Sequence, residues 1–382
     1  MKNTTTRRGF IKQVAATGVG LTIGGMSFKA TSAKSYANIM GSNERVNMAV
    51  MGTNGRGAGM ARNFQSRKDV EMRYVCDVEE KALAKGVAAV KKVGGNPKTE
   101  KDIRKILEDK NIDAILVTAP DHWHAPATIM ACQAGKHVYC EKPCSHNPHE
   151  GELSLAAARK YNRVVQVGAQ RRSWPGLTEG IEALHNGVIG KVHFAKAWYT
   201  NNRKSIGFGK EIPAPSTIDF DLWQGPAPRR SYRDNLIHYN WHWFWHWGTG
   251  EALNNGTHEI DVVRWGLGLD FPTAVSSEGG RFRYKDDWET PDTQTIDIRL
   301  PCTWEGRSCN SRDTEGRDRG VIFYGEGGAL ETGHNGYRIF DMKNKLVKEL
   351  ASKDVIDGRD PNSPSANLDM GHIADFIDAI KT

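Results

Sequence analysis

Three features are scarce in this sequence: metal-spaced cysteines, excess charge in the main body of the chain, and long apolar runs. Six cysteines are present, but none forms a CxxC pair with the spacing of a metal site, so a zinc-type fold is not predicted. Cys76 and Cys140 lie in predicted strands and are expected to act as apolar filler. Cys302 and Cys309 flank a Gly-containing turn and could cross-link a hairpin in an oxidising compartment.

The net charge of +7 belongs almost entirely to the start of the chain. Residues 1–37 contain six Lys and Arg side chains and no acid, so the remainder carries only +1. A nearly neutral body lacks the basic surface that nucleic-acid binding requires. No nucleic-acid partner is therefore predicted.

The only apolar run that could suggest a membrane span, residues 14–26, is short and rich in Gly and Thr. It follows T-R-R-G-F-I-K at residues 6–12, a twin-arginine pattern, and precedes small residues at 30–37 that suit cleavage. We predict that residues 1–37 are a removed twin-arginine signal and that the folded protein is exported to the periplasm with its cofactor, without stable membrane insertion. A retained anchor and a chance arginine pair are the alternatives.

The body of the chain opens with a pattern typical of dinucleotide binding. A predicted strand at 46–51 leads into G-T-N-G-R-G and a helix through residue 64, and the next strand, 73–76, ends in Asp77. The glycines let the backbone approach a pyrophosphate, and the helix N-terminus offers unpaired N–H groups. Asp77 can accept hydrogen bonds from ribose hydroxyls and would repel a 2′-phosphate, so NAD is favoured over NADP. The predicted cofactor contacts here are Gly52, Asn54, Gly55, Arg56, Gly57 and Asp77; an ordinary Gly-rich turn is the alternative.

A second strand–helix–strand unit occupies residues 113–143. A strand at 115–117 ends at T-A-P, a helix is predicted over 124–134, and a strand at 137–140 ends in Glu141-Lys142-Pro143. Ligands bind at the carboxyl ends of parallel strands, so these loops are expected to form the site. The predicted cofactor contacts here are Pro120, His124, Glu141 and Lys142, and Gln170 follows the next strand, 164–168.

The second half of the chain changes character after about residue 170. Strands are predicted at 192–199, 274–284, 293–300, 320–324 and 336–341, a helix at 250–268, a polar linker at 351–366 and a last helix from 373. Residues 201–250 carry many aromatics and few regular signals, so we expect a long loop across the active-site mouth. The predicted fold class is α/β, with a nucleotide-binding domain at 45–170 and a substrate and oligomerisation domain at 171–382 that contains a large, mostly antiparallel open sheet.

These motifs resemble those of the Gfo/Idh/MocA oxidoreductases, named for glucose–fructose oxidoreductase and inositol dehydrogenase. The similar segments are the Gly-rich turn at 52–57, Asp77, T-A-P-D-H-W-H at 118–124, E-K-P at 141–143 and G-T-G-E-A-L-N-N-G-T-H-E-I-D at 248–261. The resemblance implies an N-terminal Rossmann domain, NAD(P)-dependent chemistry on sugars or cyclitols, and a sheet that pairs subunits into dimers or tetramers. It also implies that Lys142 and His258 lie beside the nicotinamide. The exported, Trp-rich form is similar to the secreted, glucose–fructose oxidoreductase-like branch.

The chain departs from the family pattern at two places. Many members carry Asp four residues before the helix histidine, where this chain has Asn254, so a Lys–Asp–His relay cannot be carried over intact. Relatives also continue beyond the position of Thr382 through a helix that packs back on the nucleotide domain, so the C-terminal domain could be truncated.

Oxidation of a secondary alcohol requires a base for the hydroxyl proton, and we assign that role to Lys142, placed by a Lys–Pro bond that could be cis. His258 and Asn254 are predicted to assist, while Asp261 is expected to be structural. The predicted substrate contacts are Arg171, Trp174, Trp243, Trp245 and His258, because aromatic rings stack on sugar faces. His238, His242 and His246 recur every four residues, but the interleaved aromatics favour an irregular loop over a metal-binding helix.

The sequence therefore predicts an exported oxidoreductase that transfers hydride between tightly bound NAD and a ring hydroxyl of a sugar or glycoside. One alternative is an NAD-dependent, redox-neutral glycoside hydrolase or lyase. The other is a non-catalytic sugar-binding relative.

Overall fold

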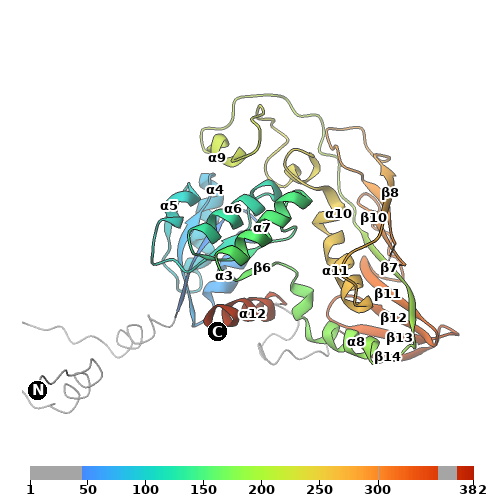
Figure 1. Ribbon diagram of the computed structural model, residues 1–382. Coiled ribbons are helices and arrows are strands. Elements are labelled where there is room, and N and C mark those ends of the chain that lie inside the picture. The colour runs from blue at the N-terminus through green and yellow to red at the C-terminus, as the bar shows by residue number, and fades with distance from the viewer. Residues whose placement is uncertain (1–44, 300, 352–367) are drawn as a thin grey trace, which may run out of the picture. The chain divides into compact units, whose positions relative to one another are not determined.

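The computed structural model describes residues 45–299, 301–351 and 368–382 (Figure 1). The predicted export signal and nearly all of the predicted linker lie outside these residues. Within the described part of the chain, no helix combines the length and apolar character that crossing a membrane would require.

The first sheet has six parallel strands in the order β3-β2-β1-β4-β5-β6. Its strands are β1 (Val46–Met51), β2 (Val70–Cys76), β3 (Lys98–Glu100), β4 (Ala114–Val117), β5 (His137–Cys140) and β6 (Val165–Val167). The crossover helices are α3 (Arg56–Gln65), α4 (Glu80–Lys91), α5 (Ile103–Leu107), α6 (Asp121–Gln133) and α7 (Pro148–Lys160). This doubly wound order confirms the predicted Rossmann domain and puts the topological switch point between β1 and β4, where ligands bind.

The core of this domain explains why its strands read as continuous apolar runs. All four residues of β4 are buried, as are Met48 and Val50 of β1, because helices cover both faces of a parallel sheet. Helix α6 begins at Asp121, three residues earlier than predicted, because Pro120 has the extended conformation of an N-cap and Asp121 suits the first turn.

The last helix, α12 (Asp369–Lys381), packs on the nucleotide-binding core rather than on the second sheet. Ile373, Phe376 and Ile377 are fully buried beside β1 and α3, and Phe376 meets the ring of Tyr139 edge-on. Helix α12 thus packs back on the nucleotide-binding domain. By packing, it belongs with the Rossmann core and not with the domain predicted at 171–382.

The second sheet has eight strands in the order β14-β13-β12-β11-β7-β10-β9-β8 and is mostly antiparallel, as predicted. Its strands are β7 (Val192–Thr200), β8 (Val275–Gly280), β9 (Thr293–Ile298), β10 (Cys302–Arg307), β11 (Arg319–Gly325), β12 (Gly328–Thr332), β13 (Tyr337–Asp341) and β14 (Leu346–Leu350). One face packs on α8 (Pro175–His185) and α11 (Gly256–Leu267), whose apolar side chains share a core with β7 (Figure 1).

Three of these strands, β10, β12 and β14, and helix α8 were not predicted. Glycines interrupt β10, β12 and α8, and β14 is exposed and charged, so none shows a clean apolar period. The disulfide considered for Cys302 and Cys309 was wrong: both thiols are free. Strand β10, rather than a turn, separates them and holds them about 20 Å apart. The helix predicted at 250–268 is broken at Asn255 into α10 (Gly250–Asn254) and α11.

Residues 201–249, which we call the strap, run over the carboxyl ends of the Rossmann strands. The strap contains α9 (Phe220–Gln224) and the 3₁₀ turn η2 (Asn240–Trp243), as expected for a largely irregular loop. It contacts the Rossmann domain where Ile218 bridges to Glu79 and where the carbonyl of Trp223 accepts from Trp123 Nε1 at 3.0 Å.

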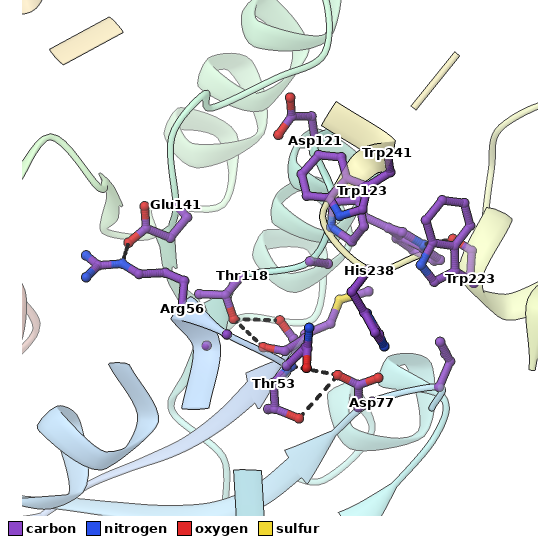
Figure 2. Close-up of a pocket in the computed structure, with 18 of the residues that line it drawn as sticks. Thr53, Arg56, Asp77, Thr118, Asp121, Trp123, Glu141, Trp223, His238 and Trp241 are labelled. Atoms are coloured by element: carbon purple, nitrogen blue, oxygen red, sulfur yellow. Dashed lines mark hydrogen bonds and ion pairs between the residues drawn. The ribbon is translucent and has the colours of Figure 1, made fainter. Parts of the chain in front are cut away.

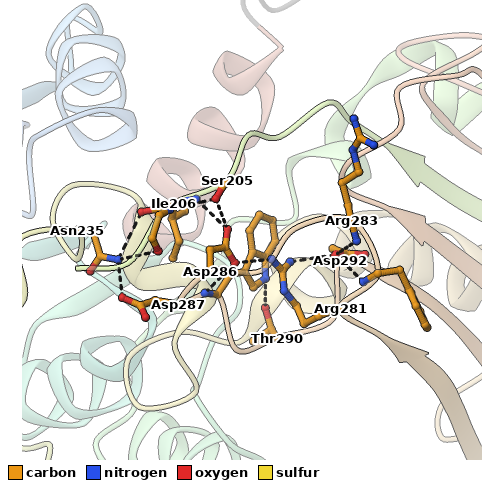
Figure 3. A network of polar contacts seen from close by, with 12 residues as sticks. Ser205, Ile206, Asn235, Arg281, Arg283, Asp286, Asp287, Thr290 and Asp292 are labelled. Atoms are coloured by element: carbon orange, nitrogen blue, oxygen red, sulfur yellow. Dashed lines mark hydrogen bonds and ion pairs between the residues drawn. The ribbon is translucent and has the colours of Figure 1, made fainter. Parts of the chain in front are cut away.

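Two other parts of the strap, residues 205–209 and 233–235, are held by a polar network with residues 281–292 (Figure 3). Asp287 accepts hydrogen bonds from the amide of Gly209 at 2.6 Å, from Arg233 at 2.7 Å and from Asn235 at 2.9 Å. Asp286 accepts from Ser205 and pairs with Arg281. The strap is therefore tied both to the Rossmann domain and to residues 281–292.

Candidate functional site

A cavity of about 500 Å³ lies at the carboxyl ends of β1, β2, β4 and β5, beneath the strap (Figure 2). All eleven predicted cofactor residues line it: Gly52, Asn54, Gly55, Arg56, Gly57, Asp77, Pro120, His124, Glu141, Lys142 and Gln170. The predicted catalytic residues Asn254 and His258 line it as well, from α10 and α11.

The glycine turn at residues 52–57 forms a cradle, and two of its glycines lie where the backbone leaves no room for a side chain. Gly52 has φ +87°, and a Cβ there would lie 2.7 Å from the amide nitrogen of Ala119. A Cβ at Gly57 would lie 1.8 Å from the carbonyl oxygen of Gly52, whereas nothing approaches Gly55 within 4 Å. Helix α3 begins here without a side-chain cap, so its first N–H groups face the open space that a pyrophosphate would fill.

Asp77 is oriented by the Rossmann backbone at the end of β2. Its Oδ2 accepts from the amide of Thr53 at 2.6 Å, and its Oδ1 accepts from the amide of Glu79 at 3.0 Å (Figure 2). Burial raises the pKa of Asp77 above its usual 3.8, and these hydrogen bonds oppose that shift. Lone pairs remain for ribose hydroxyls, and Glu79 beside it adds negative charge that disfavours a 2′-phosphate.

Arg56 and His124 connect parts of the cavity wall rather than point at a free ligand position. The Arg56 guanidinium pairs with Glu141 and Asp369, each at 2.8 Å, and so joins α3 to the E-K-P loop and to α12. His124 is buried, with Nδ1 2.5 Å from the carbonyl of Pro143 and Nε2 2.7 Å from that of Ala119. His124 therefore links the two ligand-binding loops, at Ala119 and at Pro143.

Lys142 is held at the centre of the cavity. Its Nζ donates to the Asn254 side chain at 3.0 Å and to the Asn254 carbonyl, and the Lys142–Pro143 bond is cis as anticipated. Burial lowers the pKa of Lys142 below its usual 10.5, while Glu141 is the strongest of the carboxylates that act in the opposite direction. An amine with a lowered pKa beside a cofactor cavity is suited to general-base chemistry.

His258 lies in the first turn of α11, next to Lys142 in the same cavity. Burial, together with the positive charges of Arg171 and Lys142, holds the pKa of His258 well below its usual 6.5. The imidazole is therefore neutral at physiological pH and can exchange a hydrogen bond with a substrate hydroxyl.

A second cavity of about 260 Å³ adjoins the first across Gln170 and His258. The predicted substrate residues Arg171 and Trp174 line it, together with Arg319 of β11, Asp318 just before it and His334 between β12 and β13. Arg171 is fixed by a buried ion pair with Glu259 at 2.7 Å. These side chains offer donors and acceptors on all sides of the cavity, a chemistry that suits a hydroxyl-rich ligand.

The structure does not bring the predicted substrate residues Trp243 and Trp245 into either cavity. Trp243 is buried and stacks on Trp288 with ring centroids 4.0 Å apart, and Trp245 is 55% exposed. Asp261 pairs with Arg172 at 2.7 Å outside the cavities, as expected of a structural residue. The two indoles were misassigned because aromatic composition alone does not show which ring faces the site.

The three evenly spaced histidines of the strap have separate partners. His238 lies 2.8 Å from Glu79, His242 stacks on Trp241, and His246 contacts the Pro228 carbonyl. Among the residues that the structure describes, no group of three potential metal ligands comes together.

Several cavity residues were missed by the sequence reasoning. Trp223, His238, Trp241 and His242 of the strap face the cofactor cavity, and burial lowers the pKa of His242 to about 4 (Figure 2). The aromatic cluster at 239–247 signalled the region, but its loop geometry has no period that would tell inward from outward rings. Glu251 of α10 was also missed; its carboxylate accepts from Asn254 Nδ2 at 3.2 Å.

Two family profiles match the chain, one over the first sheet and one over part of the second. One, described as an oxidoreductase family with an NAD-binding Rossmann fold, matches residues 46–169, and one for the C-terminal alpha/beta domain of the same family matches 190–286. The chain belongs to the Gfo/Idh/MocA oxidoreductase family. Its Rossmann domain is of the NAD-binding type, and the cradle at Gly52–Gly57 with Asp77 fits that cofactor.

Curated members of the Gfo/Idh/MocA family match part of the chain. An uncharacterised oxidoreductase of Bacillus subtilis is 40% identical over 233 residues, 60% of this chain and 57% of that protein. A myo-inositol 2-dehydrogenase of Thermotoga maritima is 31% identical over 173 residues, 45% and 47% of the two chains. A glycosyl hydrolase family 109 protein of Stenotrophomonas maltophilia is 27% identical over 257 residues, 62% and 56%. The chain thus spans about half the length of the curated relatives it matches.

Solved structures of similar fold cover most of the chain. A levoglucosan dehydrogenase in complex with NADH and levoglucosan superposes with a TM-score of 0.65 at 16% identity, covering 88% of this chain and 90% of that one. An NAD-binding oxidoreductase from Klebsiella pneumoniae gives 0.65 at 17% identity with the same coverage. At this identity the likeness concerns the fold.

Proposed function

We propose that this family member is an exported, NAD-dependent dehydrogenase that transfers hydride between a tightly held nicotinamide cofactor and a ring hydroxyl of a sugar or glycoside. The observation that carries the proposal is the position of the Lys142 amine. It is desolvated and hydrogen-bonded to Asn254. It lies in the same cavity as His258 and the glycine cradle. Relatives named as inositol and levoglucosan dehydrogenases support a polyol or sugar substrate.

The side chains account for the proton that an alcohol loses on oxidation. The bound nicotinamide would supply the hydride acceptor. The neutral Lys142 amine takes the hydroxyl proton, and Asn254 accepts hydrogen bonds from the resulting ammonium. Neutral His258 orients the hydroxyl oxygen from the other side. The rest of the substrate would extend toward Arg171, Trp174 and Arg319 in the adjoining cavity.

The strap supports tight retention of the cofactor. Residues of α9 and of 237–242 line the cavity that the glycine cradle opens, and hydrogen bonds tie the strap to the Rossmann domain at Trp223 and to Asp287 at Gly209. A cofactor held in this way must be regenerated in place. We propose that a second sugar or keto-sugar accepts the hydride from the reduced cofactor and so regenerates NAD. The twin-arginine pattern at residues 6–12 supports export, because free nicotinamide cofactor is scarce outside the cytoplasm.

The proposal is tested by mass spectrometry of methyl and aryl glycosides after incubation with NAD-loaded protein. Loss of two hydrogens with the glycosidic bond intact is the expected result. Lys142→Ala should retain NAD and lose turnover by a factor on the order of 10² or more, because the base is gone. Lys160→Ala, on the exposed end of α7, is the matched control and should behave as wild type. Wild-type turnover in Lys142→Ala would refute the assignment of the base.

A redox-neutral glycoside hydrolase is the second candidate, favoured by the similarity to glycosyl hydrolase family 109 proteins and by the enclosed cofactor. In that case oxidation by NAD, with Lys142 as the base, would be transient and the sugar would leave at its starting redox state. Release of free sugar at an unchanged redox state would establish this reaction in place of the dehydrogenase. No change to any glycoside would instead favour the non-catalytic sugar-binding relative.

A further inference from the structure

Glu251 is a buried carboxylate beside the site to which the proposed chemistry gives no role. Its side chain is 3% exposed on α10, in the middle of four donors. Asn254 Nδ2 and Arg203 Nη2 donate to Oε1, each at 3.2 Å, and Asn255 Nδ2 also donates to Oε1. Arg203 Nε donates to Oε2. Both oxygens of this carboxylate are therefore occupied as acceptors, which fixes its position.

The Asn254 amide connects this charge to the base. As an ammonium group, Lys142 Nζ has only hydrogens to offer, so in that form the Asn254 atom that faces it at 3.0 Å must be the oxygen. Glu251 has only lone pairs to offer, so the Asn254 atom facing it must be the nitrogen. The two neighbours therefore allow one orientation of the amide, and Glu251 is the one that excludes the flipped form.

We propose that Glu251 is a positioning residue for the reaction: through the Asn254 amide it fixes the Lys142 amine toward the substrate and supplies the carboxylate that position 254 lacks. The inference rests on the proposed dehydrogenase function. The sequence already pointed to the gap, because Asn254 stands where many relatives carry Asp. In the structure the nearby carboxylate belongs to Glu251, three residues before Asn254 on α10.

A merely structural role for Glu251 has to be separated from this one. Arg203 belongs to the strap and stacks on Trp243, with its guanidinium carbon 4.8 Å from the ring, so the Glu251–Arg203 pair also anchors the strap. Losing that anchor would weaken cofactor retention or folding. Any water that a loosened strap admitted would raise the pKa of Lys142, which is opposite to the effect of removing a negative charge.

The decisive readout is therefore the titration of Lys142 in the holoenzyme. The charged and titratable groups that face Lys142 are Arg56 of α3, Asp121 of α6, Glu141 after β5, His242 of η2, Glu251 of α10 and His258 of α11. Glu251→Gln removes one negative charge and leaves the others. The acid limb of the oxidation rate should then move to lower pH by roughly half a unit or more, because the ammonium form loses stabilisation. The maximal rate should fall about tenfold, because the amide can flip.

Restoring the charge at the neighbouring position gives the sharper test. In Glu251→Gln combined with Asn254→Asp, a carboxylate faces Lys142 directly, so the acid limb should return to higher pH and part of the rate should recover. Asn254→Asp alone sets two carboxylates side by side on α10 and should be slower than wild type. The proposal is overturned if the limb of Glu251→Gln stays where it is, or if the double variant is no better than that single one.

Two controls keep the outcome interpretable. Glu331→Gln removes another buried, arginine-paired carboxylate, on β12 and outside both cavities, and should leave the acid limb unmoved. Acetylation of Lys142 by acetic anhydride, followed against pH by mass spectrometry, reports its titration without turnover. If wild type oxidises no sugar, the proposed function fails, yet a lower acetylation midpoint in Glu251→Gln would still support the coupling. Equal midpoints would reject it.

Discussion

At the scale of single residues, the site works by removing water from groups that would otherwise be charged. Burial lowers the pKa values of both Lys142 and His258, so both favour their neutral forms in the cavity. For a base whose active form is neutral, the rate of sugar oxidation should rise with pH through the pKa of Lys142, which lies below 10.5. The reverse reaction needs the protonated amine and should show the opposite slope.

His258→Gln tests the second partner of the substrate hydroxyl. The amide keeps hydrogen-bonding capacity but has a different reach, so we expect oxidation to slow by a factor on the order of 10² while NAD occupancy stays unchanged. Steady-state kinetics with the preferred glycoside and the absorbance of bound cofactor measure both. His149→Gln, at an exposed histidine of α7, is the matched control. An unchanged rate would make His258 a packing residue.

Asp77→Ser tests the choice of cofactor. Serine can keep a hydrogen bond to the Thr53 amide but loses the charge that repels a 2′-phosphate, so NAD should bind about tenfold more weakly, ~1.4 kcal/mol, and NADP more tightly than in wild type. Calorimetric titration of cofactor-stripped protein with each dinucleotide gives the answer. An unchanged preference for NAD over NADP would indicate that Glu79, and not Asp77, excludes the 2′-phosphate.

At the scale of elements, the strap combines two tasks because it crosses from one sheet to the other. Its Rossmann side presents Trp223 and Trp241 to the cavity, and its other side is tied to residues 281–292 by Asp286 and Asp287. The stacking of Trp243 on Trp288 adds an aromatic contact between the strap and residues 281–292. Retention of the cofactor should therefore depend on contacts that never touch it.

Asp287→Ala tests that dependence. The change leaves the amide of Gly209 and the side chains of Arg233 and Asn235 without their shared acceptor, so the strap should open more often and NAD should dissociate faster, by about tenfold or more. Stopped-flow or gel-filtration loss of bound NAD measures the rate. Asp270→Ala, at an exposed position after α11, should not change it. Equal rates of NAD dissociation from the two variants would show that the Asp287 contacts do not control retention of the cofactor.

At the scale of the whole molecule, the exported dehydrogenase that we propose would be a self-contained unit, because the strap covers its cofactor cavity. It must meet both the hydride donor and the hydride acceptor at one site, and assembly into dimers or tetramers through the second sheet is proposed from the family resemblance alone. The twin-arginine route fits because it carries proteins already folded around a cofactor.

Replacing both Arg7 and Arg8 with Lys tests the route. The precursor should stay in the cytoplasm, because the route requires the arginine pair, while the retained protein still binds NAD. Cell fractionation with immunodetection and cofactor analysis measures both. Unimpaired export would point to a different signal.

The fold was largely readable because its signals are local. Parallel strands buried on both faces give continuous apolar runs, and a glycine cradle needs glycine at fixed spacings, so β1, β4, Asp77 and Lys142 could be predicted from the chain alone. The second sheet was less readable. Exposed β14 and the glycine-interrupted β10 and β12 are stabilised by their neighbours more than by their own sequence.

The sequence by itself determined the family, the Rossmann domain, the NAD cradle and the residues most suited to the chemistry, since each depends on residue type at a fixed local spacing. Only the tertiary structure decided which aromatic rings face the cofactor, that α12 packs on the Rossmann core, and that Glu251 stands behind Asn254 and Lys142. These depend on side-chain direction and on contacts between residues up to several hundred positions apart, which no local pattern encodes.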